Sequence, residues 1–419
     1  QAPSRDTTMS DYDADVLIVG AGPAGALAAR HLARGGASVR LLDASHPREK
    51  PCGGGLTERS VALAGDVLAR VPHVVVERVR FESPPVGRNP YPTPRGTPPS
   101  ITVDIPRGGD GGPPSPLVVV SRRAFDAALV DDAREAGADL IPERAVDVHV
   151  DGESVWVSTR HRRWRGRFLI GADGANSLVR RRLHQAFPAS HWSLATGVFA
   201  AGATSGEIVV RFVQRPPGYI WSFPRPDHLA IGICAPADRA TAPELRDHLE
   251  RWLAGQDIAQ GCALAPYSWP IPSLPARAWA DGVPAGDRWL LAGDAAGLVD
   301  PLTREGIYHA LRSGELASRA LLAGGSQPGR EYAGAVQTEL VTELALSARA
   351  RGTFFSPIVT RLWIDVLRES PRVRSMALKV VVGTLGYYHL RRRAVAALEP
   401  GAALRVARAQ AARYLRLAP

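Results

Sequence analysis

The sequence has few of the residues that build metal and disulfide sites. Its 419 residues include three cysteines, Cys52, Cys234 and Cys262, which are too few for a four-cysteine iron–sulfur cluster and too scattered for a disulfide scaffold. The eleven histidines show no HExxH or similar ligand spacing, so we expect no metal site. The apolar run MALKVVVGTLGYYHL near the C-terminus is too short to span a bilayer. These absences favour a cytoplasmic globular protein.

Lysine is also rare, because only Lys50 and Lys379 occur among the 51 basic residues. The net charge of +10 is concentrated near the C-terminus, where residues 361–419 hold twelve Lys or Arg against three acids. A basic, partly apolar helical region can lie on the anionic inner face of a membrane. A helical cap with a solvated arginine face is the alternative. No recognition motif accompanies the charge, so we expect no nucleic acid partner.

The first motif is a glycine-rich turn between two expected strands. Residues 16–19 form a continuous apolar run, and a second strand is expected at residues 38–42, directly before the acid Asp43. The run at 16–19 follows aspartates rather than positive charge, so we expect a buried parallel strand and no signal peptide. Glycines at such a turn let a pyrophosphate approach backbone N–H groups, and the acid accepts hydrogen bonds from ribose. The pattern predicts dinucleotide binding by Gly20, Gly22, Pro23, Ala24, Gly25 and Asp43.

Two later segments identify the dinucleotide. Residues 168–180 read FLIGADGANSLVR, and residues 289–307 read WLLAGDAAGLVDPLTREGI. With the glycine turn, this order resembles the para-hydroxybenzoate hydroxylase-type flavoprotein superfamily. The resemblance implies FAD, with Asp294 on the ribityl chain unless it is only a helix N-cap. A helix N-terminus after Pro301 would stabilise the anion formed on flavin reduction. The implied additional contacts are Arg122, Asp173, Gly174, Gly293, Gly306 and Ile307.

Two further segments resemble the geranylgeranyl reductase family. Residues 50–55 read KPCGGG, and residues 216–224 read PPGYIWSFP. Alternate strand residues share a face, so Tyr219, Trp221 and Phe223 would form one aromatic wall. Such a wall is either ordinary core or the side of an apolar pocket. The resemblance implies that it lines a cavity holding a polyprenyl chain beside the flavin.

The KPCGGG loop and Arg304 leave alternatives open. Three consecutive glycines let a planar ring or a substrate approach the backbone, which puts Cys52 and Gly53 near the flavin. Cys52 could donate a proton, or it could be a small buried apolar residue. Arg304 stands where the family often has a GEGI-like segment. Its guanidinium could stabilise reduced flavin, contact an anionic substrate group or point outward.

These patterns predict an α/β fold in which a Rossmann-like FAD-binding domain is interleaved with a mixed β-sheet substrate domain. The FAD-binding domain is expected at 11–75, 118–185 and 282–330. The substrate domain is expected at 76–117 and 186–281, with a helical region at 331–419. Residues 83–116 hold eleven prolines and six glycines around one short expected strand, ITVDI.

The expected activity is FAD-dependent reduction of C=C double bonds in a prenyl, isoprenoid or similarly apolar substrate. We expect Cys52, Tyr219 and Trp221 to act in catalysis, and Tyr219, Trp221, Phe223 and Arg304 to contact substrate. The alternative is a class A flavin monooxygenase that hydroxylates an apolar or aromatic substrate. The sequence has no second glycine loop for NAD(P)H, so the electron donor is either transiently docked NAD(P)H or a reduced carrier protein.

Overall fold

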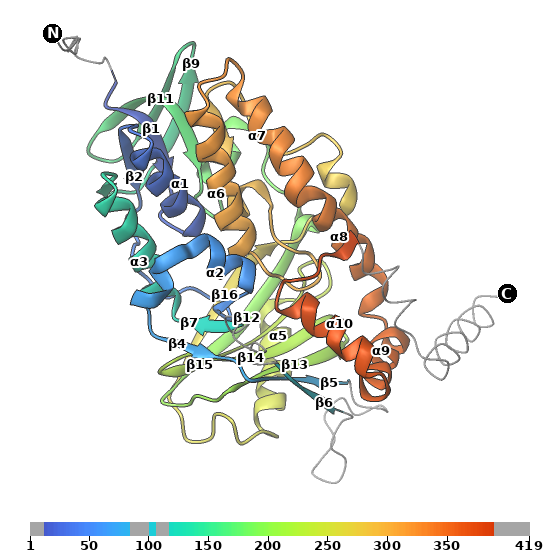
Figure 1. Ribbon diagram of the computed structural model, residues 1–419. Helices are drawn as coiled ribbons and strands as arrows, with labels where there is room; N and C mark the ends of the chain where they lie inside the picture. The colour runs from blue at the N-terminus through green and yellow to red at the C-terminus, as the bar shows by residue number, and fades with distance from the viewer. Residues whose placement is uncertain (1–11, 84–99, 106–116, 389–419) are drawn as a thin grey trace, which may run out of the picture.

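The computed structural model describes residues 12–83, 100–105 and 117–388, which fold around two large sheets and a smaller one (Figure 1). The first sheet has the order β8-β2-β1-β11-β10-β9, with β17 paired to β11. Its strands are β1 (Ala14–Val19), β2 (Val39–Leu42), β8 (Asp139–Ile141), β9 (Asp147–Asp151), β10 (Ser154–Ser158), β11 (Arg163–Gly171) and β17 (Trp289–Leu291). Pairs among β8, β2, β1, β11 and β17 are parallel, whereas β9, β10 and β11 pair antiparallel.

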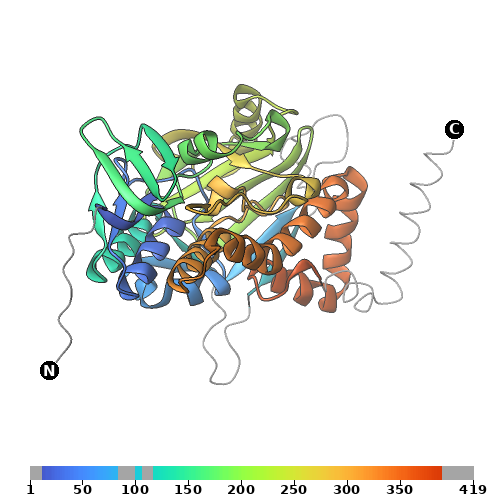
Figure 2. The same cartoon turned by 90° about the horizontal axis from the view of Figure 1, so that it is seen from above.

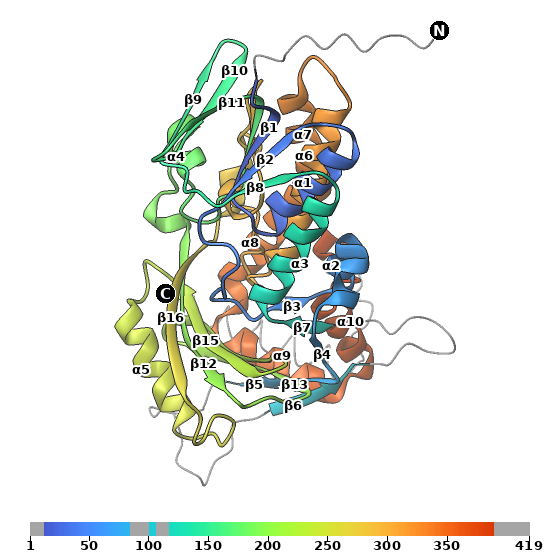
Figure 3. The ribbon, with the colours of Figure 1, turned by 90° about the vertical axis from the view of Figure 1, so that its left-hand side faces the viewer.

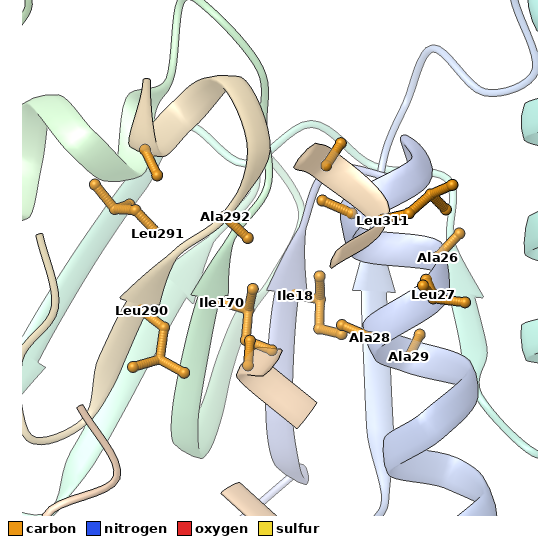
Figure 4. Close-up of a cluster of buried hydrophobic side chains, with 14 of the residues drawn as sticks. Ile18, Ala26, Leu27, Ala28, Ala29, Ile170, Leu290, Leu291, Ala292 and Leu311 are labelled. Atoms are coloured by element: carbon orange, nitrogen blue, oxygen red, sulfur yellow. The ribbon is translucent and has the colours of Figure 1, made fainter. Parts of the chain in front are cut away.

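Helices bury one side of the parallel strands. The helix α1 (Pro23–Arg34) packs between α3 (Arg122–Glu135) and α6 (Ile307–Leu322). Figure 4 shows the core beneath them, where Ile18 of β1 and Ile170 of β11 lie in one buried cluster with Leu311 of α6. A strand with neighbours on both sides and helices above it needs an almost continuous apolar run. The expected buried parallel strand at 16–19 is therefore confirmed.

The second sheet is antiparallel apart from the β5–β13 pair and has the order β16-β12-β15-β14-β13-β5-β6. Its strands are β5 (Arg78–Glu82), β6 (Ser100–Asp104), β12 (Trp192–Ala201), β13 (Glu207–Gln214), β14 (Pro217–Pro224), β15 (His228–Pro236) and β16 (Leu264–Pro272). The helix α5 (Ala242–Leu253) covers its outer face (Figure 3), where Trp252 packs with Ile220 of β14. The other face of the sheet is turned toward the interior.

A three-stranded sheet joins the two halves. Its strand order is β3 (Gly55–Leu56), β7 (Val118–Val120) and β4 (His73–Val75). Between β3 and β4 the chain forms α2 (Glu58–Ala64) and a 3₁₀ turn at Gly65–Arg70. Strand residues alternate between faces, and β7 uses this alternation to serve both cores. Val118 and Val120 belong to the cluster under the first sheet, whereas Val119 belongs to the cluster at the far end of the second.

The C-terminal described residues are helical. They form α7 (Pro328–Val336), a π-helical turn at Gln337–Val341, α8 (Thr342–Phe354), α9 (Pro357–Glu369) and α10 (Pro371–Val381). Ser356 and Ser370 cap α9 and α10, because their hydroxyls accept hydrogen bonds from Val359 N and Val373 N. Seen from above, the red helices α9 and α10 lie at the opposite end of the molecule from strands β9–β11 (Figure 2).

The remaining short elements are α4 (Leu178–Leu183) and 3₁₀ turns at Ala189–His191, Ala276–Trp279 and Gly293–Ala296. The expected fold class is confirmed, including the C-terminal helices as far as residue 388. The domain boundaries stay a prediction. In the structure, β5 and β6 join the second sheet, whereas β4 before them and β7 after them join the small sheet. Most of the loop expected at 83–116 and seven of the twelve basic residues of 361–419 lie outside the described residues.

Candidate functional site

Backbone contacts close the glycine-rich turn between β1 and α1. Gly20 has a φ of +104°, and a Cβ on Gly25 would lie 1.9 Å from Gly20 O. Both positions therefore exclude larger residues. The N-cap of α1 is Gly22, which provides no side-chain cap for the first N–H groups of the helix. Uncapped N–H groups at a helix N-terminus bind phosphate, so this turn fits the pyrophosphate of a dinucleotide.

Asp43 lies at the end of β2 as expected and is tied to the same turn. Its Oδ2 accepts a hydrogen bond from Ala21 N at 2.9 Å, and its Oδ1 accepts bonds from Ser45 N and Oγ at 2.8 Å. Burial opposes ionisation, but these hydrogen bonds outweigh it and lower the pKa of Asp43. A carboxylate has about four acceptor positions, so one remains for a ribose hydroxyl.

The carboxylate of Asp294 is the clearest unoccupied acceptor in the cavity. None of the described residues donates a hydrogen bond to it. Burial raises the pKa of Asp294, and the charges of Arg122 and Lys50 only partly oppose this effect. Asp294 is not a helix N-cap, because Ala292 holds that position in the turn at Gly293–Ala296, so the capping alternative is wrong. A free acceptor beside the N-terminus of α6 fits the ribityl chain of FAD.

Asp173 of the DG motif is used mainly by the protein itself. Its carboxylate accepts hydrogen bonds from Ser177 Oγ and from the backbone N–H groups of Leu178 and Val179, so it caps α4. Arg180 donates to Ala295 O at 3.1 Å, which fastens this motif to the turn carrying Asp294. The Asp173–Gly174 turn lines the cavity, where its backbone is available to a cofactor.

A buried cluster of charged side chains lies beside the glycine turn. The sequence did not predict that these side chains meet. Arg122 pairs with Asp126 through Nε and Nη2 at 2.9 and 3.0 Å, and Lys50 Nζ lies 2.6 Å from Asp126 Oδ2. Burial opposes the charge of Arg122, but the Asp126 carboxylate beside it outweighs burial and raises its pKa overall. Arg122 and Lys50 both line the cavity, and Asp126 could have been inferred from its i,i+4 spacing to Arg122.

The ring that approaches the KPCGGG backbone is Phe223 of the protein. A Cβ on Gly53 or on Gly55 would lie 2.9 Å from the Phe223 ring. Gly54 has a φ of +80°, and a Cβ there would lie 2.3 Å from Val120 O. The glycines are therefore required by packing against Phe223 and β7. From the sequence, the expected partner of this backbone was a planar ring or a substrate. Cys52 and Gly53 line the cavity at this loop.

A buried salt bridge fixes this loop to the second sheet. Arg225 is 0% exposed, its Nη1 lies 2.5 Å from Glu49 Oε1, and it donates to Cys52 O. Glu49 also accepts hydrogen bonds from Ser121 Oγ and Arg122 N. Burial opposes ionisation of Glu49, but the Arg225 charge outweighs it and lowers the pKa. The pair was not predicted from the sequence, although Arg225 directly follows the aromatic signature and Glu49 directly precedes the glycine loop.

The aromatic wall of β14 faces the cavity. Tyr219, Trp221 and Phe223 all line it, whereas the intervening Ile220 packs under α5 on the other face. The Tyr219 and Trp221 ring centroids are 5.8 Å apart, and Tyr219 stacks on Phe355 at 6.2 Å. The Tyr219 hydroxyl donates to Thr303 O, and burial raises its pKa well above the ordinary value. Tyr219 is therefore a neutral binding group whose proton is already engaged.

One cavity of about 1430 Å³ contains both halves of the site. Its polar end is formed by the glycine turn and the Asp294 segment. Its other end is apolar and reaches α9 and α10, where Leu362, Val366 and Met376 line it opposite Phe81 and Phe212. Ligand pockets usually have volumes of about 300–1,000 Å³, so this cavity can hold a cofactor together with a second molecule.

Arg304 and a neighbouring pair complete the lining. Arg304 does not point outward, because its Nε and Nη1 are buried. Glu305 Oε2 lies 2.9 Å from Nδ1 of His309, which is 5% exposed and stands on the first turn of α6. Burial opposes ionisation of Glu305, but His309 lowers its pKa. The pair was not predicted from the sequence, although the i,i+4 spacing of its two residues at a helix start could have indicated it.

Within the described residues, no group of three or more His, Cys, Asp or Glu side chains could hold a metal ion. None of the helices in the same residues combines the length and apolar character needed to cross a bilayer.

Comparisons with known proteins agree with this geometry. The family described as FAD binding domain matches residues 13–323. A menaquinone reductase of Mycobacterium tuberculosis is 32% identical over 351 residues, which cover 74% of this chain and 77% of the relative. A geranylgeranyl diphosphate reductase of Rhodobacter capsulatus is 31% identical over 326 residues, which cover 74% of this chain and 75% of the relative.

The fold is shared with a solved structure. A geranylgeranyl bacteriochlorophyll reductase-like protein from Thermoplasma acidophilum superposes with a TM-score of 0.71 at 19% identity, covering 91% of this chain and 99% of the other. The family match spans most of the chain, and the cavity offers the phosphate-binding turn and the free carboxylate that FAD needs. The chain therefore belongs to the FAD-binding flavoproteins, as an oxidoreductase of the geranylgeranyl reductase family.

Proposed function

We propose that this protein uses FAD to reduce C=C double bonds of an isoprenoid or similarly apolar substrate. The observation that carries the proposal is the single cavity in which the Asp294 segment, the Cys52 loop and the wall of Tyr219, Trp221 and Phe223 meet. Its apolar extension toward α9 and α10 suits a long hydrocarbon chain. The names of the relatives also denote isoprenoid compounds, menaquinone and geranylgeranyl diphosphate.

The cofactor-binding roles follow from the contacts described above. The uncapped start of α1 and the turn at Gly20, Gly22 and Gly25 would hold the pyrophosphate, and Asp43 a ribose. Asp294 would accept from the ribityl chain, and Gly306 and Ile307 at the start of α6 would face the flavin edge. When bound, FAD supplies the hydride for the reduction.

The side chains of the wall have two tasks in this reaction. Tyr219, Trp221 and Phe223 would give the hydrocarbon chain apolar contact and exclude water from it. An isolated alkene is a poor hydride acceptor, so protonation must lead or accompany the transfer. The π faces of Trp221 and Tyr219 would favour the positive charge that develops.

The proton must be held on a side chain that lines the cavity. Cys52 is the predicted donor, with its Sγ 3.4 Å from Gly54 N and its thiol near Arg122. Tyr219 is a poorer donor, since its hydroxyl hydrogen is engaged by Thr303 O. The His309–Glu305 pair also lines this cavity, so His309 would be a second candidate to carry the proton.

The electron donor and the place from which the substrate is taken complete the proposal. Transiently docked NAD(P)H or a reduced carrier protein would serve as donor. The protein would work in the cytoplasm at the inner face of a membrane, taking an apolar substrate from the bilayer. Five basic residues on α9 and α10 support this placement, because the same two helices line the apolar end of the cavity: Arg361, Arg368, Arg372, Arg374 and Lys379.

The test is a single-turnover reaction of FAD-loaded protein reduced with dithionite, which needs no natural donor. Incubation with geranylgeranyl diphosphate or menaquinone without oxygen should oxidise the flavin, and mass spectrometry should show a gain of two hydrogens. Under air, a gain of one oxygen atom with no loss of alkene would identify the hydroxylase alternative. Protein that binds no FAD, or reduced protein that neither lipid reoxidises, would contradict the proposal.

A further inference from the structure

Arg304 has a backbone conformation that disfavours side chains. Its φ is +63°, and among the described residues it is the one non-glycine residue with a positive φ. The loop that imposes this conformation is firmly held, since Asp300 accepts hydrogen bonds from Leu302 N at 2.7 Å and Thr303 N at 3.0 Å. Arg304 N itself donates to Asp300 O at 2.9 Å. Glycine would adopt this conformation without strain, so the arginine carries a conformational cost.

The guanidinium of Arg304 lacks a counter-charge. Its Nε and Nη1 are buried, the one polar side chain recorded within its reach is the weakly accepting Cys234 thiol, and no described carboxylate forms an ion pair with it. A second cation is near, because burial and the charge of Arg304 both lower the pKa of Arg351. Within the described part of the chain, the hydrogen bonds of the Arg351 guanidinium go to the neutral oxygens of Ser273. A guanidinium without a carboxylate partner favours a bound anion, and Arg304 lines the cavity at this end.

The neighbours of Arg304 belong to the substrate side of the cavity. Burial raises the pKa of the Cys234 thiol on β15, and Arg304 partly offsets this effect. Arg304 acts in the same way on Tyr219 of the aromatic wall. The cations that act most on Asp294, at the cofactor end, are instead Arg122 and Lys50. Arg304 therefore lies where a substrate beside the wall would reach it.

We propose that Arg304 binds a phosphate ester at the head of the substrate, such as the phosphate of a prenyl diphosphate or of an isoprenoid phospholipid. This inference rests on the proposed function, since it assigns one end of the same substrate. A guanidinium presents N–H donors in a planar fork that matches phosphate oxygens, which a neutral lipid head cannot neutralise. The chain of the bound molecule then lies along Tyr219 and Trp221.

The test compares ligands that differ only in the head group. Binding of geranylgeranyl diphosphate and of geranylgeraniol to FAD-loaded protein is measured by calorimetry, at low and high salt. A charge-assisted contact should give the diphosphate a preference of about tenfold to a hundredfold. Arg304→Gln should abolish that preference and its salt dependence while leaving affinity for the alcohol unchanged.

Two further variants keep the test informative. Arg304→Gly removes the charge and relieves the positive φ, so it should fold at least as well as the parent and lose the same preference. Arg239→Gln, at a side chain that is 69% exposed, is the matched control and should change nothing. An isoprenoid phospholipid, as a second ligand, shows whether the phosphate belongs to a soluble ester or a membrane lipid.

Specific results would overturn the inference. Equal affinity of the parent protein for both compounds, or an unchanged preference in Arg304→Gln, would show that Arg304 binds no phosphate. Weaker binding of menaquinone in Arg304→Gln, with diphosphate unaffected, would assign the residue to a carbonyl oxygen. A change only in flavin absorbance or in its reduction by dithionite would assign it to the cofactor. If the parent protein binds and reduces neither lipid, the proposed function fails as well.

Discussion

The two ends of the cavity are built by different means. At the cofactor end, fixed hydrogen bonds and ion pairs position most of the polar side chains, as Asp43 illustrates with three donors, and Asp294 is the exception. At the wall, apolar rings provide most of the surface, and Trp221 Nε1 is buried without a partner. Directed bonds select one cofactor geometry, whereas an apolar surface selects by shape and tolerates related chains. The cofactor end should therefore be intolerant of substitution, and the wall should affect turnover rather than assembly.

The largest effect is expected at the glycine turn. In Gly25→Val the new side chain would overlap Gly20 O, because even a Cβ would lie 1.9 Å from it. The turn must open, which removes the phosphate-binding geometry, so we expect no bound flavin by absorbance. Gly334→Ala is the control, since no atom lies within 4 Å of a Cβ there and helical alanine is favoured. Retention of FAD by Gly25→Val would show that the turn does not hold the cofactor.

The second largest effect, a loss of stability, is expected at the salt bridge that joins the glycine loop to the second sheet. Arg225→Met leaves the Glu49 carboxylate without its buried partner, which should lower the free energy of unfolding by about 3–5 kcal/mol. Denaturant unfolding measures this loss. The double variant Arg225→Met, Glu49→Gln should recover part of it, because no charge is then stranded. Additive losses in the double variant would contradict a direct pairing between the two residues.

At the wall we expect a kinetic effect. Trp221→Leu keeps an apolar side chain but removes the π face, and it should slow alkene reduction about tenfold, or ~1.4 kcal/mol of barrier. Single-turnover flavin reoxidation measures the rate, and absorbance measures bound FAD. Ile220→Val, on the opposite face of the same strand, is the control and should keep the parent rate. Loss of FAD from Trp221→Leu would make the residue structural.

The smallest effect concerns pH and Asp294. A carboxyl group whose pKa is raised in the folded protein binds more protons folded than unfolded. Its contribution to stability is therefore greatest in acid and is lost as pH rises from its unfolded pKa, about 3.9, through its folded pKa. Asp294→Asn should raise the stability of FAD-free protein at pH 7 by about 1 kcal/mol, while weakening FAD binding. Thermal unfolding between pH 4 and 8 tests this, with exposed Asp281→Asn as control.

Sequence reasoning anticipated the local structure where a pattern is carried by neighbours in the chain. The glycine turn, the acid after β2 and the alternation along β14 each follow from local backbone geometry. It failed for groups joined across the fold, such as Glu49 with Arg225, because a separation of 176 positions along the chain gives no spacing signal. The sequence also left the reason for the glycines of the KPCGGG loop undecided, and only the packing in the structure identified Phe223 as their partner.

The amino-acid order alone therefore determined the nucleotide fold, the cofactor class and the aromatic face, since each depends on periods of a few residues. Tertiary structure decided which charged side chains form ion pairs and which one does not. Asp126 and Glu49 found cations through distant elements, whereas Arg304 found no carboxylate among the described residues. Electrostatic energy depends on distance and burial, and these are set only when remote segments pack together.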